Sequence, residues 1–288
     1  MQKLNIYLQH ILPQHAISRV VLVFTRIKWK PLKNALIALF MRGFKPDLSD
    51  AVVTDPFAYE HFNAFFTRAL RAGSRPLAGS ALTLVSPVDG TMSELGAIEH
   101  NRILQAKGHS YTLESLLAGA AAQWAPRFIG GQFATIYLAP YNYHRIHMPA
   151  DGSLSAAWYV PGRLFSVNAT AARMVPGLFA RNERVVLLFD GVCGPFAVIF
   201  VGALNVGSMA TVWHGDVTPR RPRQVTQLPL PPPAERYRAR GAEIGRFNMG
   251  STVVLLFAKD RVALARELGH GATMRLGQEL GSITSAPA

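Results

Sequence analysis

The most informative stretch of this sequence is Phe247-Asn248-Met249-Gly250-Ser251-Thr252-Val253-Val254-Leu255-Leu256-Phe257. Its second half is a run of β-branched and large apolar residues, a pattern typical of a buried strand. Gly250, at the mouth of that strand, can take backbone angles closed to other residues and leaves its carbonyl open to close approach. The next residue, Ser251, carries a hydroxyl. A peptide carbonyl and a potential nucleophile are therefore adjacent, although the local pattern equally describes an ordinary turn before a strand.

Short β-rich runs, separated by Gly, Pro and Asp-Gly, fill most of the chain from residue 82 onward. The runs are residues 82–85, 91–95, 103–106, 132–138, 185–189, 196–201, 210–213 and 252–257. Many short strands between turns predict a sandwich or barrel-like β body. One Ala- and Leu-rich interruption at residues 113–122 predicts a helix. Together with helices expected near the N-terminus, the pattern predicts an α+β fold that is predominantly β.

The first 46 residues are strongly basic, with eight Lys or Arg and no Asp or Glu, in a chain of net charge +13. Apolar residues at helical spacing predict two amphipathic helices, one on each side of Pro31. Basic helices of this kind lie at the interface of an anionic membrane, although helices packed on a main domain have the same pattern. We predict a helical membrane-associating region over residues 1–75 and a β-rich catalytic domain over residues 76–288. The apolar positions are Ile17, Val20, Val21, Phe24 and Ile27, then Leu32, Ala35, Leu36, Leu39 and Phe40.

The composition is 49% hydrophobic and 16% charged over 288 residues, enough for a sizeable core. A single cysteine, Cys193, excludes an internal disulfide and a cysteine-rich zinc site, and we expect it to be buried. No run approaches the ~18–20 apolar residues of a spanning helix, and the first 16 residues do not have the order of a secretory signal. Residues 55–72 predict one or two further short helices. Residues 216–240, with six Pro and six Arg, predict an extended, exposed loop.

Asp89, a histidine and Ser251 supply the parts of a carboxylate–imidazole–hydroxyl relay, in which the imidazole removes the hydroxyl proton. Residue types alone leave other interpretations open. The Asp-Gly at residue 89 is also a hairpin signal. His144 and His147 can equally be metal ligands, acid–base groups or structural hydrogen-bonding groups. Because no third ligand lies nearby in sequence, we predict no metal site.

Several motifs, in order from about residue 60 to residue 281, resemble the phosphatidylserine decarboxylases of the bacterial type. Two features depart from that pattern: Met249 stands where the family usually has Leu, and residues 219–240 have no counterpart. The motifs are Ser86-Pro87-Val88-Asp89-Gly90, Tyr143-His144-Arg145-Ile146-His147-Met148-Pro149, Phe165-Ser166-Val167-Asn168, Leu178-Phe179-Ala180-Arg181-Asn182-Glu183-Arg184-Val185, Gly245-Arg246-Phe247, Gly250-Ser251-Thr252 and Gly269-His270-Gly271.

The resemblance implies a self-processing proenzyme of phospholipid biosynthesis. Ser251 would attack the Gly250 carbonyl and become a covalent pyruvoyl group, the cofactor, leaving chains 1–250 and 251–288. By the same resemblance, Asp89 and His147 serve the cleavage and His144 serves decarboxylation. The pyruvoyl carbonyl would act as the electron sink while phosphatidylserine loses carbon dioxide to give phosphatidylethanolamine.

The expected partners are phosphatidylserine, an anionic membrane surface and the second chain made from the same precursor. A homodimer is a family expectation, and we expect no nucleic acid. The expected place is peripheral, on the cytoplasmic side of the cell membrane. Two alternatives remain open: a pyruvoyl-dependent decarboxylase of a soluble amino acid, which the lipid-directed N-terminus disfavours, and a non-enzymatic basic β-domain that binds nucleic acid. The latter lacks the combined aromatic and basic pattern of known modules.

Overall fold

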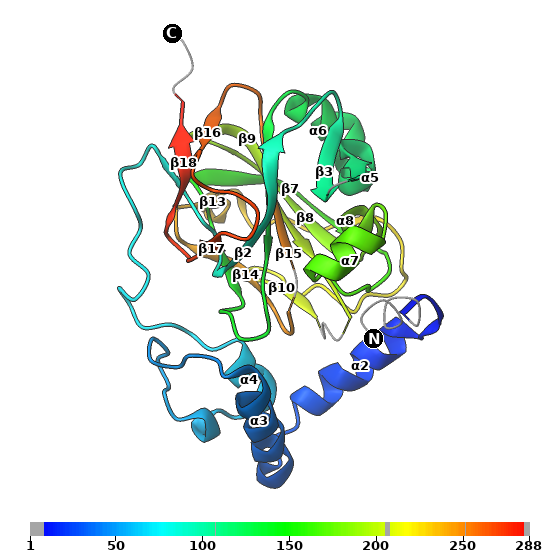
Figure 1. Cartoon of the computed structure of the whole chain (residues 1–288), viewed down its shortest axis with the longest axis vertical. Coiled ribbons are helices and arrows are strands. Elements are labelled where there is room, and N and C mark those ends of the chain that lie inside the picture. The colour runs from blue at the N-terminus through cyan, green and yellow to red at the C-terminus, as the bar shows by residue number, and fades with distance from the viewer. Residues whose placement is uncertain (1–8, 107, 205–207, 251, 285–288) are drawn as a thin grey trace.

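The computed structural model describes residues 9–106, 108–204, 208–250 and 252–284. A body of antiparallel sheets carries an N-terminal helical region (residues 9–66) at one end, opposite β16 and β18 (Figure 1). This arrangement confirms the predicted α+β fold. The helical region contains α2 (Gln14–Thr25), α3 (Lys30–Phe44), η1 (Pro56–Ala58) and α4 (Phe62–Phe66). No helix in the described ranges is long and apolar enough to span a bilayer.

The largest sheet has nine strands and places β15, the strand that follows residue 251, near its centre. Every residue of β15 pairs with β5 on one side and with β9 on the other, and all six are buried. Its strand order is β12-β7-β8-β9-β15-β5-β2-β17, with β13 also paired to β7. The strands are β2 (Gly90–Ala97), β5 (Gln132–Tyr137), β7 (Gly152–Val160), β8 (Arg184–Gly191), β9 (Gly194–Val201), β12 (Thr226–Gln227), β13 (Tyr237–Arg238), β15 (Thr252–Phe257) and β17 (Thr273–Met274).

A smaller sheet with the order β11-β10-β14-β6 adjoins the start of β15. Its strands are β6 (Arg145–His147), β10 (Met209–Thr211), β11 (Gly215–Asp216) and β14 (Glu243–Phe247). The chain leaves β14 at Phe247 and enters β15 at Thr252, so residues 248–251 connect the two sheets. The other strands are β1 (Thr83–Val85), β16 (Val262–Leu264) and β18 (Glu279–Ile283) in one sheet, and β3 (Arg102–Ala106) and β4 (His109–Thr112) in a hairpin.

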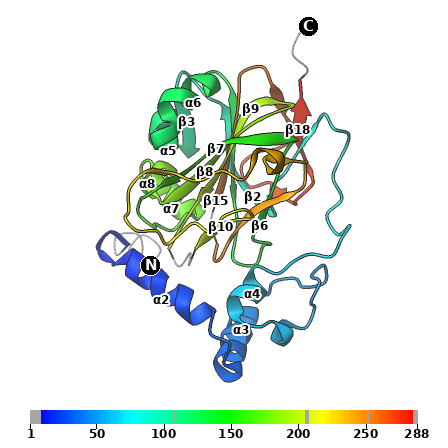
Figure 2. The same ribbon diagram turned by 180° about the vertical axis from the view of Figure 1, so that it is seen from behind.

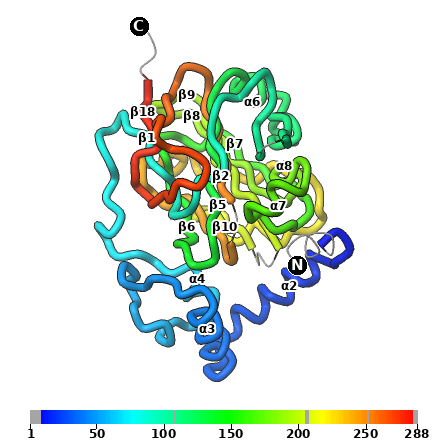
Figure 3. The backbone as a smooth tube through the Cα atoms, in the orientation of Figure 1, coloured from blue at the N-terminus to red at the C-terminus, as the bar shows by residue number. Residues whose placement is uncertain are grey.

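Short helices cover one side of the body (Figure 2). Side chains cap two of them: Thr112 Oγ1 accepts from Ser115 N, and Asn168 Oδ1 accepts from Ala171 N. An extended segment between α4 and β1 runs along the other side of the body (Figure 3). The covering helices are α5 (Leu113–Leu117), η2 (Ala118–Ala120), α6 (Ala121–Phe128), α7 (Ala169–Met174) and α8 (Leu178–Arg181), while η3 (Pro233–Glu235) lies in the Pro/Arg-rich segment.

The buried side chains form two clusters. One fills the β body, and the second lies within the N-terminal helical region, where aromatic rings pack edge to face around Phe40. Met249 packs against this second cluster and so joins the helical region to the segment before β15. The second cluster consists of Ile37, Phe40, Leu48, Ala51, Phe62, Phe65 and Phe66.

The eight predicted strand runs all contain observed strands, and the two predicted N-terminal helices are confirmed as α2 and α3. Cys193 is buried and free, as expected. One detail differs from the prediction. The loop predicted over residues 216–240 is mostly irregular, but β12 and β13 pair with β7 and extend the sheet. Within the helical region, Lys33 is buried, and its Nζ donates to Phe57 O at 2.6 Å and Tyr59 O at 2.7 Å.

Candidate functional site

His144 is fully buried beside the Gly250 end of the connection between β14 and β15. Its Nδ1 lies 2.8 Å from Asn142 O, which can only accept, so Nδ1 carries the proton and Nε2 has a free lone pair. Nε2 lies 3.4 Å from the point where a Cβ on Gly250 would stand. It has no hydrogen-bond partner within the described part of the chain. Burial lowers the pKa of His144 from 6.5 to about 3, so the imidazole is neutral at pH 7.

The ring of Phe66, from α4, holds His144 in place on one face. The two ring centroids are 4.1 Å apart. Because Phe66 belongs to the aromatic cluster of the helical region, the imidazole at Gly250 is packed against that region as well as against the β body.

His147 ends β6 and is held at both ring nitrogens. Nδ1 donates to Gly241 O at 2.8 Å, and the free Nε2 accepts from the Tyr143 hydroxyl at 3.0 Å. Burial lowers the pKa of His147, outweighing the attraction of nearby carboxylates, so this imidazole also favours the neutral form. The two histidines therefore differ at Nε2: that of His147 has a partner, whereas that of His144 has none in the part of the chain that the structure describes.

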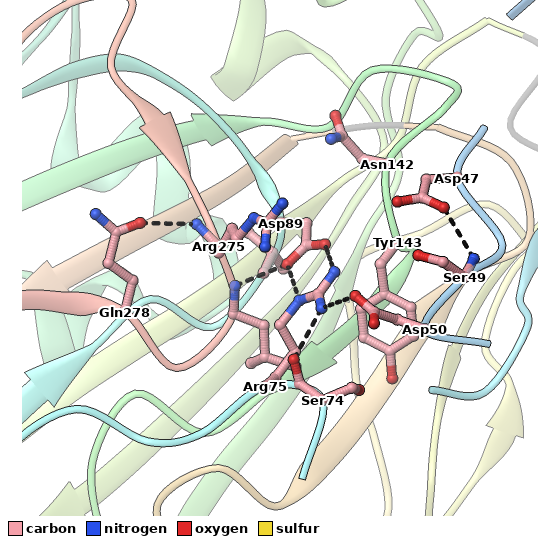
Figure 4. Close-up of polar contacts among 12 residues, drawn as sticks. Asp47, Ser49, Asp50, Ser74, Arg75, Asp89, Asn142, Tyr143, Arg275 and Gln278 are labelled. Atoms are coloured by element: carbon pink, nitrogen blue, oxygen red, sulfur yellow. Dashed lines mark hydrogen bonds and ion pairs between the residues drawn. The ribbon is translucent and has the colours of Figure 1, made fainter. Parts of the chain in front are cut away.

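Asp89 lies on the turn before β2 and is held by an arginine from the extended segment before β1 (Figure 4). Arg75 donates from Nε at 3.1 Å and from Nη2 at 2.8 Å, and Leu276 N donates to the same carboxylate at 2.8 Å. Arg75 also contacts Asp50 at 2.6 Å. Among the described residues, no hydrogen bond joins Asp89 to His147. The structure thus brings His144 to Gly250 and places Asp89 and His147 in separate hydrogen-bond sets.

Gly250 lines a cavity of about 280 Å³ with a mostly apolar wall. Ser251, the predicted nucleophile, lies outside the described residues. Thr252 follows it at the start of β15, and its Oγ1 is buried without a partner in the described ranges. Two buried polar atoms near Gly250, His144 Nε2 and Thr252 Oγ1, therefore have unused hydrogen-bonding capacity among the described residues: the imidazole nitrogen can accept a hydrogen bond, and the hydroxyl can donate one. The cavity is lined by Phe40, Phe44, Phe66, Tyr137, Leu138, Pro140, Ser166, Val167, Ala203, Leu204, Met249 and Gly250.

A second apolar cavity of about 270 Å³ lies between α2, α3 and α4. It shares Phe40, Phe44 and Met249 with the first cavity, so the two cavities are neighbours that meet at these side chains. The second cavity is lined by Val21, Phe24, Thr25, Leu36, Leu39, Phe40, Phe44, Phe62 and Met249.

Sequence reasoning identified the histidines, Asp89 and the Gly-Ser pair, but missed the residues that hold them. Tyr143 had a visible signal, since it lies within the histidine motif and four residues before His147. Arg75 had none, because its partner Asp89 lies 14 residues away across a change of element.

The sequence matches a family model described as phosphatidylserine decarboxylase over residues 62–282, and a second model described as PSD over residues 4–45. A protein named phosphatidylserine decarboxylase proenzyme from Ectopseudomonas mendocina is 52% identical over 284 residues, which is 98% of each chain. Proteins of the same name from Pseudomonas putida and Azotobacter vinelandii are 49% and 50% identical, over 99% and 96% of each chain. The chain therefore belongs to the phosphatidylserine decarboxylase family, as its motifs predict.

Proposed function

We propose that this protein decarboxylates phosphatidylserine to phosphatidylethanolamine with a pyruvoyl group that it makes from Ser251. The observation that carries the proposal is the buried, neutral and unpartnered Nε2 of His144 beside Gly250. Buried polar atoms normally have partners, so one without a partner among the described residues, next to Gly250, is a candidate for chemistry. The word proenzyme in the names of the relatives supports a processed precursor.

The proposed cleavage uses only residues of this chain and water. Ser251 Oγ attacks the Gly250 carbonyl carbon, and the peptide C–N bond breaks as the ester bond forms. Loss of the α-proton of residue 251 then breaks its Cβ–Oγ bond and releases Gly250 as a carboxylate. Water replaces the nitrogen of residue 251, which leaves as ammonia, and a pyruvoyl group remains. The family resemblance assigns the proton transfers of this step to His147, with Asp89 as the supporting carboxylate.

His144 is proposed to serve the second reaction. Once formed, the pyruvoyl carbonyl supplies an electron sink for the charge left by carbon dioxide. The Thr252 hydroxyl is a group available to donate a hydrogen bond to this carbonyl. Because His144 is neutral, its Nε2 can take a proton from the substrate's ammonium group and return it to the carbon that loses carbon dioxide.

The helical region is proposed to dock on an anionic membrane, because α2 buries polar side chains and exposes apolar ones. An ordinary surface helix does the reverse. The side chains that α2 buries are Gln14, Ser18 and Thr25, all polar. Gln14 Oε1 accepts from Leu164 N at 2.8 Å, which fixes this polar face to the body. The opposite face exposes apolar side chains beside basic ones, the composition of an interfacial helix. The exposed apolar residues of α2, α3 and their junction are Val20, Val23, Phe24, Trp29, Leu39 and Phe44.

The two neighbouring apolar cavities lie between α2 and Gly250, and we propose that a lipid chain follows this path from α2 and α3 toward the site. This path favours a phospholipid over a free amino acid as the substrate. We accordingly propose a peripheral enzyme on the cytoplasmic side of the cell membrane, as the family resemblance implies.

The test is carbon dioxide release from phosphatidylserine vesicles and, separately, from free serine, measured together with chain splitting. We expect the wild-type protein to split and to act on the vesicles alone. Ser251→Ala and His147→Ala should neither split nor react, whereas His144→Ala should split and remain inactive. Release from free serine alone would favour the soluble-substrate alternative. Splitting that stops in His144→Ala but continues in His147→Ala would reverse the assignment of the two histidines.

A further inference from the structure

A chain of hydrogen bonds leads from the end of α2 to the segment before Gly250. Arg26, the residue after α2, contacts Asp216 in β11, with Nη1 2.6 Å from Oδ2. The other oxygen of Asp216 accepts from Asn248 Nδ2 at 3.0 Å. Asn248 Oδ1 in turn accepts from Asn63 Nδ2 of α4 at 3.1 Å. We call these four residues the polar clamp.

Asn248 is the centre of the polar clamp and is held on three sides. It is 3% exposed, and its backbone N donates to Ser208 O at 2.8 Å. The orientation of its amide is fixed, because the Asp216 carboxylate can only accept and must face Nδ2. Ser208 Oγ also donates to Asp216 at 3.0 Å, so the carboxylate is braced from the body side as well.

Met249 and Gly250 connect Asn248 to the proposed cleavage site. Met249 packs into the aromatic cluster of the helical region, and Gly250 has neither a side chain nor a helix or strand to fix it. Before Gly250, the last polar anchor of the backbone on the β14 side is therefore Asn248. On the other side, the ladder of β15 begins at Thr252. The position of the Gly250 carbonyl is thus set by Asn248, Met249 and the strand that follows.

We propose that Asn248 and Asp216 are positioning residues for self-cleavage at Gly250, and that Arg26 ties their position to helix α2. This inference rests on the proposed function. Attack of a neighbouring hydroxyl on a carbonyl needs the two groups within a narrow range of distance and angle, and a displacement of about 1 Å can lower such rates by a factor of about 100. A braced Asn248 keeps the carbonyl in that range. Because α2 is also the proposed membrane helix, the position of α2 on the body and the rate of self-cleavage are coupled.

The chain offers a closely matched control for Arg26. The pair Arg127–Asp190 has the same chemistry, a contact of 2.7 Å and side chains 37% and 46% exposed. For Arg26–Asp216 the contact is 2.6 Å and the side chains are 36% and 39% exposed. Exposed pairs of this kind contribute little to stability, so the loss of either ion pair should not prevent folding. Arg127 also lies over the Trp124 ring, 4.3 Å from its centroid. Only the Arg26 pair contacts the segment before Gly250.

The experiment follows the appearance of the small chain after a short pulse of cell-free synthesis of the full-length protein. The variants are Asn248→Ala, Arg26→Gln, both together, and Arg127→Gln. We expect cleavage to slow about tenfold or more in Asn248→Ala. In Arg26→Gln it should slow about 2–5-fold, the size expected for one exposed ion pair. Arg127→Gln should cleave at the wild-type rate. The double variant should be no slower than Asn248→Ala alone, because Arg26 acts only through the polar clamp.

Three outcomes overturn the inference. They are wild-type cleavage in Asn248→Ala, equal rates in Arg26→Gln and Arg127→Gln, and multiplied effects in the double variant. Melting temperatures of the Ser251→Ala precursor carrying Arg26→Gln or Arg127→Gln should agree, which separates positioning from a loss of stability. A wild-type chain that never splits refutes the proposed function itself, and the polar clamp with it. A wild-type chain that splits while Arg26→Gln splits equally fast refutes the polar clamp alone.

Discussion

His144 has the properties of a chemical group rather than a structural one. A buried histidine normally has hydrogen-bond partners at both ring nitrogens, and His147 has Gly241 and Tyr143. His144 uses only Nδ1 and turns Nε2 toward Gly250. Burial, and to a smaller extent the positive charge of Arg68, lower the pKa of His144 and keep the ring neutral. Burying the His144 imidazole with Nε2 unpaired among the described residues lowers the stability of the protein. Such a loss is expected where a group takes part in a reaction.

Stability should therefore depend on pH through His144. Its folded-state pKa, about 3, lies below the ordinary 6.5, so between these values the unfolded chain binds more protons and stability falls as pH falls. From pH 7 to pH 5 this one group should remove about 2 kcal/mol. We expect a Ser251→Ala precursor that also carries His144→Asn to lose correspondingly less, as measured by urea unfolding at both pH values. His100→Asn, at an exposed histidine, serves as the control. Equal losses in the two precursors would contradict the account of His144.

Arg75 should contribute strongly to stability, although it lies in an irregular segment. Its side chain is 13% exposed and that of Asp89 is 11% exposed. Arg75→Gln leaves Asp89 without its cationic partner, and removing one member of such a pair should cost about 3 kcal/mol. Lys28→Gln, which breaks an exposed pair with Glu60, should have no measurable effect. Urea unfolding of the Ser251→Ala precursors measures both. A loss below 1 kcal/mol for Arg75→Gln would mean that water replaces the arginine.

At the scale of elements, the sequence predicts strands well where burial and β-propensity agree. Residues 252–257 are all large or β-branched, and they form β15 with no change of boundary. The longest strand, β7, was missed because Gly152, Ser153, Ala156 and Ala157 have weak strand preference and take their structure from pairing with β8. The single helix expected over residues 113–122 is instead divided into α5, η2 and α6, with a break at Ala118, where φ is 47°, and the last of them ends at Phe128.

Helix α2 shows a different limit of sequence-based prediction. Helical spacing reveals an apolar stripe, but it does not say which side of the helix faces the body. The answer depends on Gln14, which bonds the backbone of Leu164, about 150 residues away. The same limit applies to the site: the residue types of a relay are visible in sequence, whereas the partners of Asp89, His144 and His147 come from distant segments.

Membrane binding should depend on the exposed face of α2. Val23 is 59% exposed, and Val23→Glu places a charge where we expect the bilayer interface. Flotation with anionic vesicles should show binding weakened about tenfold, from the loss of apolar burial and the added repulsion. The melting temperature should not change. Val192→Glu, at a valine 53% exposed in the turn between β8 and β9, should bind as the wild type does. Equal weakening by both variants would assign the effect to net charge alone.

In the molecule as a whole, the site lies where three parts meet. The helical region supplies Phe66 and the packing around Met249, the smaller sheet supplies His147, and the largest sheet receives the chain after the cleavage point. Because β15 pairs with β5 and β9 along its full length, the chain from residue 251 onward should stay bound to the rest after cleavage. The two chains are expected to separate only when the protein is denatured.

The central claim is that the Gly250–Ser251 bond breaks to make the cofactor, and intact mass measured under denaturing conditions tests it most directly. A preparation that releases carbon dioxide from phosphatidylserine should give two masses, for residues 1–250 and for residues 251–288 with a pyruvoyl group in place of Ser251. Ser251→Ala should give one mass and no activity. A single uncleaved chain in an active preparation would contradict the account.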